Sequence, residues 1–408
     1  MGMNTETLLI LLCSLIVLSY LFSIISRHIK VPSVLLLLFA GIGFRAIADA
    51  NNFSIHIPEI IVEGLGVVGL IMIVLEAGLD LKITKNKLPL IKSSFFAALI
   101  ILIFSAAIIS TILYYWLHEE ITRCIIYALP LSIMSSSIVL PSIHHLTRDK
   151  KEFLIYEASF SDILGILFFN YFAAREILTV RSIGLFGASI LIAVILSLVI
   201  SFLLFLLLTK TKMNIKFFLI FSLLILIYSG GKLLHIPSLL VILIFGLLIN
   251  NWELLPFPRL LKKYPHEQVE PLRELLHSIT AESSFLIRTF FFLLFGYTIE
   301  LSLINSREVV LIGSLIVIAL FVVRYLYLRF YFHTRVFPEV FFIPRGLITI
   351  VLFYKIPSYL KLTTFNDGIL FFIILSTGII LSIGMIFYKK ENDEIIEDPQ
   401  FIERKELL

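Results

Sequence analysis

The stretch YALPLSIMSSSIVLP, from Tyr127 to Pro141, is an apolar segment in which two prolines bracket a run of serines. Proline lacks the backbone N–H that a helix interior needs, so we expect a helix that is interrupted in its middle. In a membrane, such an interruption is tolerated where the freed carbonyls line a polar cavity. A second apolar segment, residues 339–356, carries Pro344-Arg345-Gly346 near its middle and is expected to be interrupted in the same way.

Composition places the rest of the chain in a membrane as well. Of its 408 residues, 59% are hydrophobic and 15% are charged, and the mean hydropathy is +1.02. This is too apolar for a water-soluble core. Apolar runs predict an all-α membrane protein with about 13 transmembrane helices, at 7–26, 31–48, 58–80, 93–117, 122–142, 152–173, 182–208, 214–231, 236–251, 278–300, 309–332, 339–356 and 366–388.

An internal similarity organises these helices into two halves. VPSVLLLLFAGIG, from Val31, pairs with IPSLLVILIFGLL, from Ile236, and keeps the Pro-Ser pair and a glycine in register. Seven helices separate the copies, and an odd number gives them opposite orientations in the membrane. A weaker similarity pairs EAGLDL, from Glu76, with FGYTIEL, from Phe295. A Pro-Ser pair before an apolar run is also an ordinary helix start.

We therefore predict two inverted six-helix repeats with interrupted crossing helices 5 and 12. One transmembrane domain is expected over 1–390, with repeat one at 7–173, a linker helix at 182–208 and repeat two at 214–388. Residues 391–408 are expected to form a short cytoplasmic acidic tail.

Basic residues predict the orientation of the chain. Lys and Arg crowd into the loops on one side, as at Lys82, Lys85, Lys87 and Lys92, and are sparse on the other. The positive-inside rule then places the N-terminus outside and the C-terminus in the cytoplasm. We expect a multi-pass protein of a bacterial-type inner (plasma) membrane.

Charged side chains inside the predicted spans are costly unless they pair or line a polar cavity; here they are Glu76, Glu157, Asp162, Glu282, Arg288, Arg324 and Arg345. Counting about 1.5 Å per residue from the inner end of the helix puts Asp162 at roughly 15 Å, the midplane, and Glu157 at roughly 8 Å. The two lie about 140° apart around the helix, so one can pair structurally while the other faces a cavity.

A midplane carboxylate holds a proton more readily than one in water, and when ionised it is a hard oxygen ligand for Na+ or Li+. We predict that Asp162 binds a proton or a cation in competition, with hydroxyl groups from Ser135, Ser136, Ser161 and Ser159. The alternative is that Asp162 is permanently paired and only joins helices.

The other charges predict a structural or modulating ion-pair cluster. By depth, Glu76 and Arg324 lie near Glu157, and Arg288 lies near Asp162. Arg345 is expected to offset the partial negative charge of helix C-terminal ends at the crossing. The roles of Glu282, His144 and His145 are left open.

These residues resemble the monovalent cation:proton antiporter superfamily, on its sodium/proton exchanger branch. LEAGLDL at Leu75 is similar to the end of the family's third helix, and EASFSD at Glu157 is similar to its E-S-x-x-N-D element. VRYL at Val323 and PRGLITIVL at Pro344 resemble its arginine-bearing segments. The resemblance implies a homodimer and an elevator-like movement of a core that carries helices 5 and 12.

The sequence also departs from the family's pattern. Ser161 stands where exchangers have Asn, Ala158 where they have Ser, and Met134-Ser135 where a Thr-Asp pair is usual. The serine-rich version is closer to potassium-efflux relatives. Loss of the second carboxylate predicts one-for-one, electroneutral exchange.

We therefore predict a secondary active transporter that exchanges a monovalent cation, Na+ before Li+ or K+, for H+ by alternating access in the lipid bilayer. Two alternatives stay open: a K+/H+ antiporter of the potassium-efflux type, and a non-transporting membrane sensor that kept the fold. No enzyme activity, cofactor, resident metal or nucleic-acid partner is expected, since no paired nucleophile and base occur in the sequence.

Overall fold

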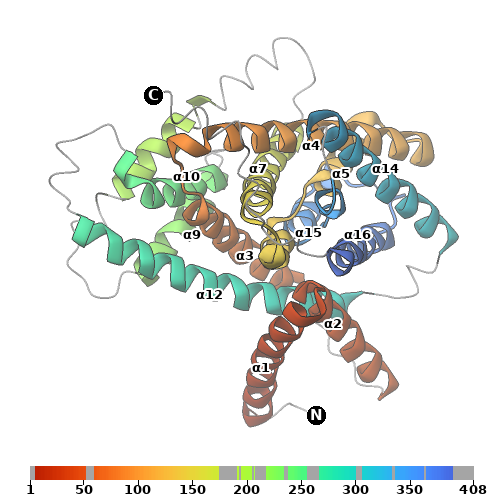
Figure 1. Cartoon of the computed structure of the whole chain (residues 1–408). Helices are drawn as coiled ribbons and strands as arrows, with labels where there is room; N and C mark the ends of the chain where they lie inside the picture. The colour runs from red at the N-terminus through yellow and green to blue at the C-terminus, as the bar shows by residue number, and fades with distance from the viewer. Residues whose placement is uncertain are drawn as a thin grey trace.

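The computed structural model describes residues 5–51, 59–173, 191–192, 194–204, 206, 217–233, 238–254, 266–299, 306–332, 336–362 and 364–388. Within this part of the chain every regular element is a helix, and there is no strand (Figure 1). The all-α class is therefore confirmed. The predicted linker helix lies partly outside the described residues, and the predicted acidic tail lies wholly outside them.

The α-helices follow the predicted apolar segments: α1 (Thr5–Ile29), α2 (Ser33–Ala50), α3 (Glu59–Asp80), α4 (Leu88–Leu117), α5 (Ile121–Ser132), α6 (Ser136–Ser142), α7 (Arg148–Ala173), α9 (Phe217–Leu233), α10 (Ser238–Asn250), α12 (His266–Thr298), α14 (Arg307–Phe332), α15 (Leu347–Tyr354) and α16 (Gly368–Phe387). Single 3-10 turns are η1 (Lys85–Lys87), η2 (Ile143–His145), η3 (Trp252–Leu254), η4 (Glu339–Phe341) and η5 (Ser358–Leu360).

Taken as membrane spans, α5 with α6 and η4 with α15 each count once, and helical residues 194–204 supply the span between α7 and α9. The prediction of 13 helices is confirmed. Six described stretches are individually long and apolar enough to cross a membrane: Ser33–Ala50, Leu88–Leu117, Ile121–His145, Arg273–Thr298, Arg307–Tyr331 and Gly368–Phe387.

One predicted boundary was wrong. Helix α12 begins at His266 rather than at residue 278, because its first turns are polar and an apolar pattern cannot reveal them. Residues 342–346 have no regular secondary structure, which confirms the predicted interruption at Pro344-Arg345-Gly346 and leaves η4 as the first half of that span. Pro344 disfavours helical backbone in the residue before it, which explains the early end.

The interrupted spans meet at the centre of the molecule. Ile133 and Ser135 have extended backbone between α5 and α6, and the Ser135 N–H donates to the Pro344 carbonyl at 3.0 Å. A side chain at Gly346 would collide with that of Ser135. In Figure 1, α5 and α15 pack against each other here, and α7 packs against α5.

Close glycine contacts join the two halves of the chain. Gly41 on α2 lies against the α12 backbone at Gly296, and Gly246 on α10 lies against the α3 backbone at Gly78. In the predicted repeat, Gly41 corresponds to Gly246. Each half therefore supplies one helix to each contact, and small residues let the helix backbones approach closely.

This packing predicts that Gly41→Ala destabilises the protein. An added Cβ would meet the α12 backbone, and overpacking of this kind costs about 1–3 kcal/mol. Thermal unfolding of purified protein in detergent should show a lower midpoint. Gly43→Ala is the matched control, because a Cβ there has no neighbouring atom within 4 Å. Equal midpoints for both variants would contradict the proposed close contact.

Candidate ion-binding site

Asp162 lies on α7 beside the break between α5 and α6. Its side chain is buried, and Oδ2 accepts a hydrogen bond from the backbone N–H of Ser136 at 3.3 Å. Neither Asp162 Oδ1 nor the Ser136 hydroxyl has a hydrogen-bond partner among the described residues. A buried carboxylate with one free oxygen can accept a proton or contribute to cation coordination.

The other predicted serine ligands have different surroundings. The Ser161 hydroxyl oxygen accepts a hydrogen bond from the Met134 backbone N–H at 2.9 Å, which ties the break to α7. The hydroxyls of Ser135 and Ser137 bond to each other at 2.8 Å. The Ser159 hydroxyl donates to the Ile155 carbonyl of its own helix at 2.8 Å. Of the predicted ligands, Asp162 and Ser136 therefore present the free oxygens.

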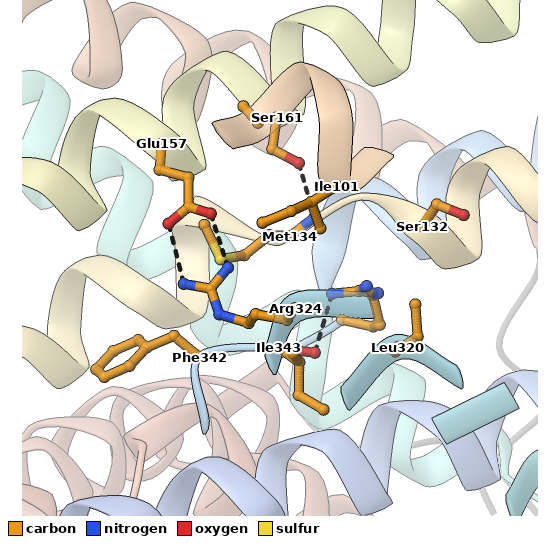
Figure 2. A pocket seen from close by; sticks show the side chains of 11 residues that line it. Ile101, Ser132, Met134, Glu157, Ser161, Leu320, Arg324, Phe342 and Ile343 are labelled. Atoms are coloured by element: carbon orange, nitrogen blue, oxygen red, sulfur yellow. Dashed lines mark hydrogen bonds and ion pairs between the residues drawn. The ribbon is translucent and has the colours of Figure 1, made fainter. Parts of the chain in front are cut away.

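Glu157 and Arg324 form the expected ion pair. Two hydrogen bonds of 2.7 and 3.0 Å join the guanidinium of Arg324 to both carboxylate oxygens of Glu157, and both side chains are only 1% exposed (Figure 2). Arg324 Nε also donates to the Glu339 carbonyl at 2.6 Å. A doubly bonded pair of this kind is strong and geometrically fixed.

Arg345 bonds to backbone carbonyls at the crossing. Its Nε donates to Leu131 O at 2.5 Å, in the last turn of α5, and its Nη1 donates to Ile343 O at 2.9 Å. The last carbonyls of a helix carry partial negative charge, which a buried guanidinium offsets. Arg345 thus occupies the position that the sequence predicted for it.

Glu76 and Arg288 form a separate pair, which corrects the prediction of one cluster. Arg288 Nη2 lies 3.7 Å from Glu76 Oε2, which is longer than a hydrogen bond. Arg288 also donates to the Ser137 carbonyl at 3.4 Å, close to the break. Depth along the spans had placed Glu76 with Glu157 and Arg324, and Arg288 with Asp162, because depth does not say which helices are neighbours.

A small cavity of about 10 Å³ lies beside the crossing, between the break after α5 and the helices α4, α7 and α14. Its polar lining is Ser132, Glu157, Ser161, Arg324 and Arg345, and Asp162 is not among the residues of its wall (Figure 2). The charged groups of Glu157 and Arg324 in this wall already bond to each other. We therefore attribute the polar lining of the cavity to this ion pair and do not assign an ion-binding site there.

Some contacts were missed by the sequence analysis. The Thr377 hydroxyl oxygen on α16 accepts from the Arg345 backbone N–H at 3.2 Å. The Tyr20 hydroxyl donates to Glu282 at 2.8 Å on the exposed surface of α1 and α12. The only sequence feature that could have indicated the role of Thr377 was a lone threonine in an apolar span.

His144 and His145, whose roles the sequence left open, line a cleft with Ser26 and Lys30.

Comparison with known proteins identifies the family and the fold. A match to the sodium/hydrogen exchanger transmembrane family spans residues 14–388. The structure of the sodium proton antiporter MjNhaP1 from Methanocaldococcus jannaschii at pH 8 has a TM-score of 0.68 and 18% identity, covering 93% of this chain and 100% of that chain. An electron-microscopy map of the same antiporter has a TM-score of 0.64 and 19% identity, covering 95% of this chain and 100% of that chain. No curated protein sequence matches the chain.

The buried pair predicts that Arg324→Ala lowers folded yield. It would leave Glu157 buried without a countercharge, at a cost of about 3–5 kcal/mol. Size-exclusion chromatography after detergent extraction should show little monodisperse protein, whereas any folded fraction should keep its cation preference. Arg329→Ala is the control, since Arg329 is exposed in the last turn of α14. A well-folded Arg324→Ala protein with altered cation preference would contradict a purely structural role for the Glu157–Arg324 pair.

Proposed function

The chain belongs to the sodium/hydrogen exchanger family, and on that basis we propose that it exchanges Na+ for H+, with Asp162 binding either ion in competition. It is a multi-pass integral membrane protein. The observation that carries the proposal is the buried carboxylate of Asp162, which has a free oxygen and no arginine or lysine bonded to it in the described part of the chain.

Competition follows from the chemistry of this group. A protonated Asp162 is neutral and suits the low-dielectric interior. Once ionised, it needs a countercharge, which a Na+ ion supplies through hard oxygen ligands. The Ser136 hydroxyl, on the residue whose N–H bonds to Asp162, is the oxygen that supports such a site. Glu157 is unsuited to the same task because Arg324 already satisfies both of its oxygens.

Alternating access is supported by the crossing. The two breaks touch through Ser135 and Pro344, and they belong to opposite halves of the chain. Interrupted helices at corresponding positions of inverted repeats place an ion site where each half reaches the midplane. Movement of a core that carries both breaks, against the rest of the protein, would then open the site to either side.

The proposed exchange is one Na+ for one H+. The side chains of the break, Ile133, Met134 and Ser135, include no second carboxylate. The carboxylate of Asp162 binds either one Na+ or one H+. The two half-cycles of transport therefore move equal charge in opposite directions. We further propose a homodimer in a bacterial-type inner membrane with the N-terminus outside, from the family resemblance and the distribution of Lys and Arg.

Substitution of Asp162 tests the function directly. In proteoliposomes with a pH gradient, addition of Na+ to the wild type should dissipate the gradient, and Asp162→Asn should reduce the rate to that of empty liposomes. Asp149→Asn, exposed in the first turn of α7, should retain exchange. Parallel additions of Li+ and K+ identify the cation. Dissipation by K+ alone would favour a potassium exchanger, and an active Asp162→Asn protein would refute the role of Asp162.

The stoichiometry predicts independence from membrane potential. Proteoliposomes clamped at 0 mV or at about −100 mV with K+ and valinomycin should show equal initial rates of Na+-driven H+ flux, because no net charge moves per cycle. The control is the same clamp without protein, which reports the leak. A rate that rises severalfold with potential would contradict electroneutral exchange.

A further inference from the structure

A line of polar groups runs between α3 and α12, apart from Asp162. The two helices pack along each other (Figure 1). At the C-terminal end of α3, His277 Nε2 lies 2.8 Å from Asp80 Oδ1. Glu76 is one turn further along α3, and Arg288 stands opposite it. The line ends where Arg288 donates to the Ser137 carbonyl beside the break.

Burial increases along this line. The side chains of His277 and Asp80 are 48% and 27% exposed, whereas those of Glu76 and Arg288 are 13% and 11% exposed. Polar groups that become progressively more buried inside a membrane protein mark ion pathways more often than plain helix contacts.

The Glu76 pair is loose, in contrast to the Glu157 pair. Arg324 makes two hydrogen bonds to Glu157, but Arg288 approaches Glu76 Oε2 only to 3.7 Å. Glu76 Oε2 is buried and has no hydrogen-bond partner among the described residues. Its charge is therefore available to another cation.

Two further oxygens lie on the same face of α12. Ser284 and Thr280 are spaced four residues apart, and Ser284 is four residues before Arg288, so all three share one face. Both hydroxyl-bearing side chains are fully buried, and neither hydroxyl has a hydrogen-bond partner among the described residues. Both hydroxyl groups therefore lie on the helix face that carries Arg288, which pairs with Glu76.

We propose that Glu76, Ser284 and Thr280 form a second cation-binding site, through which a monovalent cation passes between the end of α3 and Asp162. One carboxylate and two hydroxyl oxygens are hard ligands suited to Na+. Arg288 keeps the binding weak by sharing the charge of Glu76, which suits a site that must release its ion. The identity of the ion and its passage to Asp162 rest on the proposed function.

The test measures ²²Na+ binding to purified full-length protein in the Asp162→Asn background at alkaline pH. Asp162→Asn should retain a weak Na+ site. Adding Glu76→Gln should weaken that site on the order of tenfold or more, because the ligand charge is lost. Adding Glu282→Gln, at an exposed carboxylate on α12, should leave it unchanged. Equal binding with and without Glu76→Gln would overturn the proposal.

Two further measurements keep the test decisive. If Glu76→Gln does not fold, Ser284→Ala and Thr280→Val in the same background should each weaken Na+ binding severalfold, and unchanged binding in both would overturn the site. With Asp162 intact, Ser284→Ala should raise KM for Na+ in liposomes with little change in kcat. Wild-type protein without flux would refute the exchange function, whereas wild-type flux with no residual binding in Asp162→Asn would refute the second site alone.

Discussion

The backbone groups released at the two breaks must find partners inside the protein, because lipid offers none. The structure meets this constraint with few residues. The Ser135 N–H bonds to the Pro344 carbonyl, the Met134 N–H to Ser161, and the Ser136 N–H to Asp162. Arg345 donates a hydrogen bond to the Leu131 carbonyl at the end of α5. The ion-binding carboxylate we propose is thus one of the groups that hold the crossing together.

The buried carboxylates around this crossing fall into two groups, those that are fully hydrogen-bonded and those that keep an oxygen without a partner. Glu157 and Arg324 satisfy each other completely, so the pair fixes α7 against α14 and is unavailable to ions. Asp162 and Glu76 each keep an oxygen without a hydrogen-bond partner among the described residues. The same residue type, glutamate, is therefore fully hydrogen-bonded by an arginine at one position and only loosely paired with one at the other.

Much of the fold was predictable because the membrane imposes simple rules on sequence. Spans must be apolar and about 20 residues long, so α2, α4, α14 and α16 were located to within a few residues. Prolines located both breaks. The polar start of α12 was missed, because it leaves no apolar periodic pattern. At the site, the pairing of Glu157 with Arg324 was anticipated, whereas the hydrogen bond from the Met134 N–H to the Ser161 hydroxyl was not.

The sequence by itself determined that the chain lies in a membrane, that two of its helices are broken, and which side chains are charged at depth. These properties are local: they depend on the composition of single segments and on proline's missing N–H. The pairing of those charges was decided only by the tertiary structure. Depth along a helix says nothing about which helix lies opposite, and the packing of α3 against α12 is what brings Glu76 to Arg288 rather than to Arg324.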